Sequence, residues 1–394
     1  MKAYKDLFII DPDIIFLNHG SFGATPIPVF ERYQTWQREL EQQPVEFLGR
    51  RITTLLEESR TKLANFLNAE PDEIVYFPNP TTAINMVARN MIHNTSSISE
   101  NNATKIKLEP GDEILTTDHE YGAMDRTWYY VCKNTGARYI QVPISLPLQK
   151  PEEFVDYFWQ SVNENTRVIF ISHITSSTAL IFPVEQICKR AHEESILCIV
   201  DGAHAPGQIP VDLKKIDADI YTGACHKWLC APKGSAFLYV RKELQDWLDP
   251  LVVSWGYKSE LPSASQFIDY HEWQGTHDMA AFLTVPSAID FQRQYDWGHV
   301  SQNCHSQAIQ ARQKINSLFE QEPICSDQDT GQMFSVLLPT REDIESLKVR
   351  LYQDHAIEVP LIKWNGKNIL RVSFQAYNSM TEIDSLFNAL RYLI

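Results

Sequence analysis

The chain has 394 residues, of which 44% are hydrophobic and 22% charged, and a net charge of −15 at pH 7. A chain of this length and composition can bury a large core, and we expect it to divide into two domains. The acidic balance argues against a general binder of nucleic acid or of anionic membranes. It still allows a local basic pocket that holds a phosphate or a carboxylate.

Neither membrane insertion nor secretion is indicated by the sequence. No apolar run approaches the length that spans a bilayer, and the start of the chain, MKAYKDLFIIDPD, lacks the features of a signal peptide. The seven cysteines are scattered, odd in number and without the paired C-x-x-C spacing of metal sites. These features fit reduced thiols, and we expect a cytoplasmic protein without a bound metal.

The first glycine-rich segment is IIFLNHGSFGATPIP at residues 14–28, which predicts a strand end or an irregular loop. Asn18 and His19 in this loop could face a ligand. Turn chemistry alone would also explain the glycines, so both interpretations stay open.

Two helices are predicted for residues 31–67, because apolar residues recur there at helical spacing among Glu, Gln and Arg. The helices should break near Pro44. Arg50 and Arg51 lie just after the break, and we assign them to a solvated face. A reach into a substrate pocket is the weaker alternative.

A strand, a tight turn and a helix are predicted for residues 73–91. Glu73–Phe77 (EIVYF) forms the strand, and Thr81 and Thr82 stand just before the helix. Free backbone N–H groups and the positive end of the helix dipole meet at such a point, and two hydroxyls add to them. The pattern favours a phosphate site, although threonine is also a common helix cap.

Further strands are predicted at EILTT (113–117), at the edge strand 138–142 and at RVIFI (167–171), with helices between them. Alternation of strand and helix through residues 73–240 is typical of a mainly parallel sheet with helices on both faces. We therefore predict the α/β fold class.

The stretch from Ser195 to Val240 is the most informative part of the chain. Residues 196–200 predict a strand buried on both faces, and Asp201 stands at its carboxyl end, where α/β folds bind their ligands. A second strand leads into Ala-Cys-His-Lys-Trp, so Lys227 also follows a strand end. Either residue alone would be better explained as a helix cap or a surface lysine.

An aspartate and a lysine at neighbouring strand ends suit the chemistry of pyridoxal phosphate (PLP). This cofactor is held as a lysine Schiff base, with an acidic partner on its pyridine nitrogen. Asp201 would keep that nitrogen protonated, so that the ring accepts electrons from a carbanion at Cα of an amino acid. Lys227 would hold the aldehyde, be displaced by the substrate amine and then move protons.

Beyond residue 240 we predict a long loop, a long helix and a second domain. The expected elements are the loop 250–275, the helix 280–319, the strands 334–338 and 369–374, and the helices 341–354 and from 381. We place a large domain at residues 14–280 and a small C-terminal domain at residues 281–394, onto which residues 1–13 should pack.

Three strings, LNHGSFGATP, DGAHAPGQ and TGACHKWLCAPKGS, resemble the class V aminotransferase group of fold-type I PLP enzymes. Within that group the chain looks most like isopenicillin N epimerase-like proteins, whose relatives include cysteine and cystine C–S lyases and hercynylcysteine sulfoxide lyases. The resemblance runs from about Phe16 to Tyr377. It implies PLP as cofactor, a small amino-acid substrate, and a homodimer with shared active sites.

The resemblance also assigns residues to the cofactor. The implied cofactor-binding set is Thr81, Thr82, His119, Asp201, His204, His226, Lys227 and Thr276. His119 would stack on the pyridine ring, with Tyr121 as the nearby substitute, and would join Asp201 and Lys227 as catalytic residues. His204 would contact the ring oxygen O3′. Thr276 would reach across the dimer interface to the phosphate of the neighbouring cofactor.

Arg371, in LRVSFQAYN, matches the arginine that binds the substrate α-carboxylate in the family. A planar guanidinium suits a carboxylate because two parallel N–H groups meet two oxygens. Asn18 and His19 would lie on the substrate side of the cofactor. An ion pair of Arg371 with a surface acid is the alternative.

One departure from the sequence pattern of the family narrows the range of possible reactions. Cysteine desulfurases carry a nucleophilic cysteine on a loop shortly before the arginine, and residues 355–360 (HAIEVP) contain none. We therefore expect removal of a Cα proton without persulfide chemistry, in an epimerase-like enzyme first, a C–S β-lyase second and an aminotransferase third. A binding module that has lost catalysis is the alternative from another class.

Overall fold

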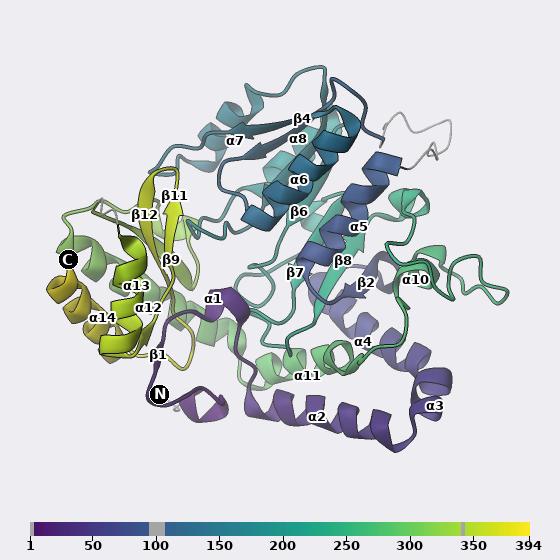
Figure 1. Cartoon of the computed structure of the whole chain (residues 1–394), viewed down its shortest axis with the longest axis horizontal. Helices are drawn as coiled ribbons and strands as arrows, with labels where there is room; N and C mark the ends of the chain where they lie inside the picture. Colours follow the sequence, from purple (N-terminus) through teal and green to yellow (C-terminus); the bar gives the residue numbers. More distant parts are fainter. Residues whose placement is uncertain (1–3, 94–106, 340–342) are drawn as a thin grey trace.

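The computed structural model describes residues 4–93, 107–339 and 343–394 (Figure 1). Its centre is a seven-stranded sheet in the order β2-β8-β7-β6-β5-β3-β4, in which only β8 runs antiparallel to the others. The strands are β2 (Ile74–Phe77), β3 (Glu113–Thr117), β4 (Arg138–Val142), β5 (Thr166–Ser172), β6 (Leu197–Asp201), β7 (Ile220–Ala224) and β8 (Ala236–Val240). The predicted α/β class and the mainly parallel sheet are confirmed.

Side chains on both faces of this sheet are buried, which is why its strands are nearly continuous apolar runs. Along β6, Leu197 and Ile199 belong to one apolar cluster, and Cys198 and Val200 belong to another. The helices of this part are α2 (Ile27–Gln42), α3 (Pro44–Glu46), α4 (Ile52–Leu67), α5 (Pro80–His93), α6 (Gly122–Thr135), α7 (Pro151–Trp159), α8 (Val184–Glu193), α9 (Leu213–Ile216) and α10 (Gln266–His271). Helices therefore cover both faces, as the alternating pattern predicted.

A second, antiparallel sheet lies on the side of the molecule that carries both chain ends (Figure 1). Its strands are β9 (Met333–Leu338), β11 (Leu361–Trp364) and β12 (Lys367–Ser373), and the nearby helices are α12 (Trp297–Leu318), α13 (Ile344–His355) and α14 (Met380–Leu393). The N-terminal residues reach the same region, since β1 (Ile15–Phe16) pairs in parallel with β10 (Ile357–Glu358). The ring of Phe8 also packs on Tyr377.

Some predicted elements differ from the structure. The expected loop 250–275 contains α10, whose Ser265 caps the helix through the N–H of Ile268. The expected helix 280–319 is two helices, α11 (Ala280–Gln294) and α12, because Asp296 has a left-handed φ of 48° between them. Helix α11 packs on α2 and α4. The domain boundary at residue 281 stays a prediction, and most of the polar stretch 93–108 lies outside the described residues.

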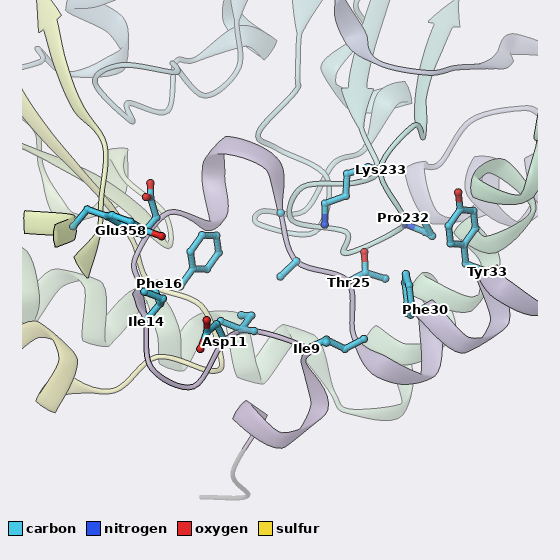
Figure 2. Close-up of a pocket in the computed structure, with 14 residues that line it drawn as sticks. Ile9, Asp11, Ile14, Phe16, Thr25, Phe30, Tyr33, Pro232, Lys233 and Glu358 are labelled. Carbon is cyan, nitrogen blue, oxygen red and sulfur yellow. The ribbon is translucent and has the colours of Figure 1, made fainter. Parts of the chain in front are cut away.

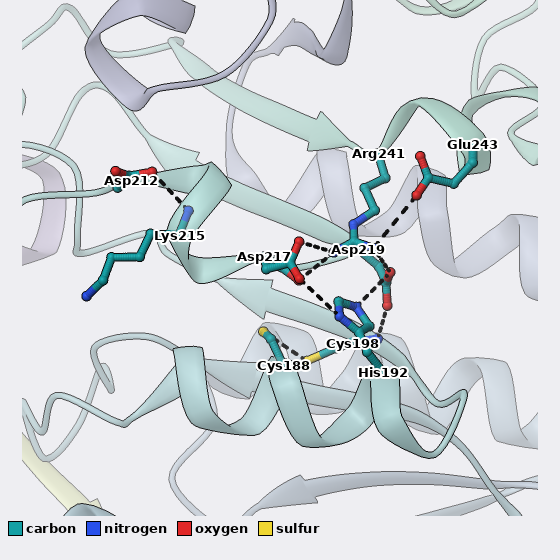
Figure 3. A network of polar contacts seen from close by, with 9 residues as sticks. All are labelled: Cys188, His192, Cys198, Asp212, Lys215, Asp217, Asp219, Arg241 and Glu243. Carbon is teal, nitrogen blue, oxygen red and sulfur yellow. Dashed lines mark hydrogen bonds and ion pairs between the residues drawn. The ribbon is translucent and has the colours of Figure 1, made fainter.

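The amino ends of β6 and β7 carry a network of paired charges (Figure 3). The His192 Nε2–H donates to Asp219 Oδ1 at 3.1 Å, and Arg241 pairs with both Asp217 and Asp219. The other carboxylate oxygen of Asp219 accepts the backbone N–H of Cys198 at 2.7 Å. Asp219 therefore ties β6, α8 and the end of β8 together. No helix of the described residues is long and apolar enough to cross a membrane.

Candidate active site

A cavity of about 240 Å³ lies at the opposite, carboxyl edge of the large sheet. Strand ends, the first turn of α5 and the short helix α1 (His19–Phe22) all contribute to its wall. The lining residues are Ser21, Phe22, Asn79, Pro80, Thr81, Tyr121, Met124, Ser172, Ile174, Ser176, Asp201, Ala203, His204, His226 and Lys227. Five of the residues singled out in the sequence for the cofactor therefore meet in one place: Thr81, Asp201, His204, His226 and Lys227.

Asp201 is the last residue of β6 and only 3% exposed. Its Oδ1 accepts the backbone N–H of Ala203 at 2.9 Å, so the turn after the strand fixes the carboxyl group. Burial raises the pKa of Asp201 above its usual value, while that backbone hydrogen bond and the nearby charge of Lys227 oppose the rise. A cationic ring nitrogen beside this carboxyl would stabilise its charged form.

Lys227 follows β7 and is half-buried. Burial, with the positive charge of Arg371, lowers the pKa of its amine to about 8, while Asp201 opposes the shift. Its Nζ lies 3.1 Å from Nε2 of His204. A lysine with this pKa has a substantial neutral fraction near neutral pH, as a nucleophile or general base requires.

His204 is oriented by Trp228, whose indole Nε1–H points to its Nδ1 at 3.4 Å. With Nδ1 as acceptor, the neutral imidazole carries its hydrogen on Nε2, on the side of Lys227. Burial, followed by the charge of Lys227, holds the pKa of His204 well below its usual value, which keeps the ring neutral. His204 therefore presents a fixed N–H donor toward the amine.

Two glycines allow the chain to pack around Lys227. Gly23 has φ of +69°, and a Cβ there would lie 2.0 Å from the carbonyl oxygen of His226. Gly207 has φ of +85°, and a Cβ there would lie 2.4 Å from the carbonyl oxygen of Trp228. Both close approaches require a residue without a side chain. The lysine segment is thus held between the loop before α2 and the turn after β6.

The first turn of α5 forms the wall beside Asp201. Asn79 Oδ1 accepts the backbone N–H of Thr82 at 2.8 Å and the Thr82 hydroxyl at 3.1 Å. Thr81 lines the cavity and Thr82 does not. Thr82 takes part in capping the helix, and its contact with a phosphate stays a prediction. His226 lines the cavity too, and its Nδ1–H donates to the carbonyl of Ser235 at 2.9 Å.

Arg371 is 4% exposed and reaches the cavity wall from β12. Its guanidinium donates to the Ser176 carbonyl at 2.6 Å and to the Ser21 hydroxyl at 2.9 Å. Its buried Nε has no hydrogen-bond partner among the described residues. The predicted alternative, an ion pair with a surface acid, is wrong, because no carboxylate of the described chain pairs with Arg371.

Asn18 acts on the cavity only through a neighbour. Its Oδ1 accepts the Ser21 hydroxyl at 2.5 Å, and its Nδ2–H donates to Glu358 at 2.8 Å. His19 is fully buried, 2.9 Å from the Tyr377 hydroxyl and 3.1 Å from the backbone carbonyl of Lys227. Neither residue lines the cavity, and direct substrate contact by Asn18 and His19 stays a prediction.

His119 also lies away from the cavity. Its ring nitrogens meet the Thr178 hydroxyl at 2.7 Å and the Ile144 carbonyl at 3.0 Å, and its ring packs on Trp364. Tyr121, the alternative, lines the cavity and is 48% exposed. The geometry therefore argues against ring stacking and catalysis by His119 and favours Tyr121. His119 and Tyr121 lie in one turn but point in different directions, and the sequence pattern of a strand end does not show which of them faces the cavity.

Other predicted and unpredicted residues complete the site. Thr276 is exposed and does not line the cavity of this chain, so its role at a partner's site stays a prediction. Arg51 pairs with Glu39 at 3.1 Å on the surface, as expected for a solvated face. Sequence reasoning missed Phe22, which is 71% exposed at the cavity, and Met124 of α6. The LNHGSFGATP string was a signal for Phe22, and no sequence pattern pointed to Met124.

Comparison with known proteins identifies the family. The sequence model of the Aminotransferase class-V family matches residues 20–386. The chain belongs to the class V aminotransferases. This class V enzyme is 34% identical over 397 residues to isopenicillin N epimerase of Amycolatopsis lactamdurans, covering 98% of this chain and 96% of that protein. It is 26% identical over 410 residues to L-cysteine desulfhydrase of Arabidopsis thaliana, covering 96% and 87%.

A solved structure shows the same fold. A lysine-to-alanine variant of C-DES, with glycine covalently linked to its PLP cofactor, superposes with a TM-score of 0.83 at 20% identity, covering 98% of each chain. The cofactor of the class V enzyme is PLP. The residues of the cavity fit it, since a lysine amine, a buried carboxyl group and the first turn of a helix lie in one wall.

Proposed function

We propose that this class V enzyme is an amino-acid epimerase, which removes the proton from Cα of its substrate and returns one to the opposite face. The observation that carries the proposal is the placement of Lys227, with a pKa of about 8, in one cavity with Asp201, while Arg371 bonds to Ser21 and Ser176 of the cavity wall. Whole-length similarity to isopenicillin N epimerase at 34% identity supports epimerisation over other outcomes of Cα deprotonation.

The cofactor would be held by the residues that line the cavity. We assign Lys227 to its aldehyde, Asp201 to its ring nitrogen, the Nε2–H of His204 to its ring oxygen, and Thr81 and His226 to its phosphate. When bound, PLP supplies a ring that accepts electrons from a carbanion at Cα. Tyr121 is assigned to the ring face, because a flat aromatic surface holds a ring by dispersion and offset stacking.

Arg371 would bind the α-carboxylate of the substrate. Its Nε–H has no partner among the described residues, and its other donors meet the Ser21 hydroxyl and the carbonyl and hydroxyl of Ser176, which a carboxylate can replace. Ser21 and Ser176 would then orient the guanidinium. Fixing the carboxylate aims the Cα–H bond, and Lys227 is the base that takes this proton.

A homodimer with shared sites completes the proposal. Thr276 and His277 are exposed and follow Gly275, which has a φ of 100°. We propose that Thr276 of one subunit contacts the cofactor phosphate held by the other. A variant that sediments strictly as a monomer and keeps its cofactor affinity unchanged would contradict this arrangement.

β-Elimination from a sulfur amino acid is the second candidate, and the similarity to an L-cysteine desulfhydrase favours it. Such an elimination begins with the same Cα proton removal. Persulfide transfer is not proposed, because none of the seven cysteines lines the described cavity. Transamination ranks third, since no specific contact supports it.

The deciding experiment incubates the PLP-loaded enzyme in deuterium oxide with a panel of L-amino acids, including sulfur amino acids and their sulfoxides. We expect loss of the Cα–H signal in proton spectra and formation of the D-epimer by chiral chromatography for a suitable substrate. Formation of pyruvate with release of a sulfur compound would indicate a lyase instead of an epimerase. Transfer of the amino group to a keto acid would indicate an aminotransferase. Absence of exchange across the panel would leave the non-catalytic binding module.

A further inference from the structure

A second and larger cavity, of about 720 Å³, lies beside the N-terminal segment (Figure 2). Its volume is within the usual range of small-molecule sites. The wall is formed by five separate segments, and most of its side chains are apolar. The apolar and aromatic part comprises Ile9, Ile10, Ile14, Phe16, Ala24, Phe30, Tyr33 and Tyr352.

One amine enters this apolar wall. Lys233, in the loop between β7 and β8, points its Nζ toward the cavity (Figure 2). It forms no hydrogen bond or ion pair with any residue that the structure describes. The side chain as a whole is exposed, yet partial burial of the amine lowers its pKa below the usual value. An anion in the cavity would therefore pair with an amine that has no other partner among the described residues.

Acidic groups stand on the other side of the cavity. Asp11 and Glu358 face Lys233 across the space (Figure 2), and Glu358 also accepts the Asn18 amide at 2.8 Å. Two carboxylates opposite one amine repel a multiply charged anion such as a phosphate ester. A single carboxylate next to Lys233 would pair with the amine on the side away from the two acids, and an apolar body would lie along the isoleucine and phenylalanine side chains.

We propose that this cavity is a second small-molecule site, which takes an amphipathic monocarboxylate with its carboxylate on Lys233. The site is distinct from the candidate active site but shares a wall with it. Ser21 and Phe22 line the active-site cavity, while Gly23, Ala24 and Thr25 line the second one. The bound carboxylate thus lies on the reverse side of the segment that orients Arg371.

The test uses isothermal titration calorimetry of the PLP-loaded enzyme with 4-phenylbutyrate. We expect one molecule bound per chain, and roughly tenfold or more weaker binding to Lys233→Met, because a charge-assisted hydrogen bond is lost. Lys233→Arg should retain binding. The neutral amide, 4-phenylbutyramide, should bind the wild type and Lys233→Met equally. Melting temperatures of the variants verify that each is folded.

Two controls separate this site from other places where a carboxylate could bind. Lys242→Met removes an exposed lysine that pairs with Asp72 and should leave binding unchanged. Arg371→Gln should also leave it unchanged, although this variant damages the proposed substrate site. Binding that survives Lys233→Met, binding that disappears in Arg371→Gln, or no binding to the wild type would each overturn the proposal.

Discussion

The two ends of strands β6 and β7 hold charge in opposite ways. At the amino ends, Asp219 lies between His192 and Arg241 in a network of ion pairs (Figure 3). At the carboxyl ends, Asp201 is buried and Lys227 is half-buried, yet neither forms an ion pair within the described residues. Glu120, which follows β3 at the same edge of the sheet, is buried too; it accepts hydrogen bonds from the Thr117 hydroxyl and from Ser172, and burial raises its pKa to about 8.

This difference teaches where stability and chemistry lie in the molecule. Paired charges at a strand end fix the backbone, whereas buried charges without ion pairs cost stability and have shifted pKa values. Such groups are retained where a ligand supplies the missing partner. Changes at the amino ends should therefore damage folding, and changes at the carboxyl ends should damage catalysis.

The largest expected effect is the loss of Lys227. In Lys227→Ala, Cα–H exchange should fall by roughly 10³-fold or more, because the base and the cofactor-holding amine are both removed. Borohydride reduction of the wild-type holoenzyme should label the peptide that contains this lysine. Lys242→Ala is the matched control and should behave as wild type. Label on another lysine would refute the assignment.

Asp201→Asn should lower turnover by roughly 10²-fold, since a preorganised charge next to the cofactor nitrogen is lost. The folded chain binds the carboxyl proton of Asp201 more tightly than the unfolded chain, because burial raises its pKa. Stability of the cofactor-free protein should therefore fall as pH rises through that raised pKa, and the variant should lack this slope. Urea unfolding over a range of pH measures this slope. An Asp201→Asn protein that is less stable than the wild type would contradict the comparison.

Arg371→Gln should weaken substrate handling more than cofactor binding. Loss of a charge-assisted contact to the α-carboxylate should reduce kcat/KM by roughly 10- to 100-fold. The absorbance of the bound cofactor, titrated against free PLP, should be nearly unchanged. Asn18→Ala, which acts through Ser21, should give a smaller change of the same kind. Equal losses of PLP affinity and kcat/KM would count against this division.

Asp219→Asn should affect the other end of the sheet. It weakens the pairing of His192 and Arg241, and we expect the free energy of unfolding to fall by about 2 kcal/mol. Activity per folded molecule should stay at the wild-type level. Glu243→Gln is the control, because this exposed pair with Arg241 should contribute less than about 0.5 kcal/mol. Lost activity in a folded Asp219→Asn protein would break the comparison.

The smallest effect concerns His192. Its hydrogen bond to Asp219 raises the pKa above the usual 6.5. The stabilisation is fully present below pH 6.5 and is lost as pH rises through the folded-state pKa. For a partly exposed group it should not exceed about 1 kcal/mol. His192→Gln should remove this dependence, measured by urea unfolding between pH 5 and pH 9; an unchanged slope would refute it.

The sequence predicted the part of the site that lies on one sheet. Asp201 and Lys227 could be recognised because each directly follows an apolar strand, and parallel strands end at the same edge. Thr82 could not be assigned securely because a helix cap and a phosphate contact share the same residue type. His119 and Tyr121 could not be told apart, although in the structure the turn after β3 directs Tyr121, not His119, toward the cavity.

Contacts between distant segments could not be predicted in this way. The Ser21 hydroxyl meets Arg371 only because α1 (His19–Phe22) and β12 are brought together in the tertiary structure. The cavity around Lys233 is formed by five segments that are each unremarkable alone. No periodicity or local spacing records such a meeting, so these parts required the structure.

The parallel pairing of β1 with β10, Ile15 opposite Ile357, has a consequence for the order of assembly in the cell. Translation proceeds from the N-terminus, and domains generally fold as units while the chain is being made. The last strand of the large sheet ends at Val240, so that sheet can form on the ribosome before Arg371 has been added. Residues 15–16 have to wait for their partner strand through most of synthesis. A nascent chain would therefore acquire the means to retain PLP before it acquires the arginine that receives a substrate.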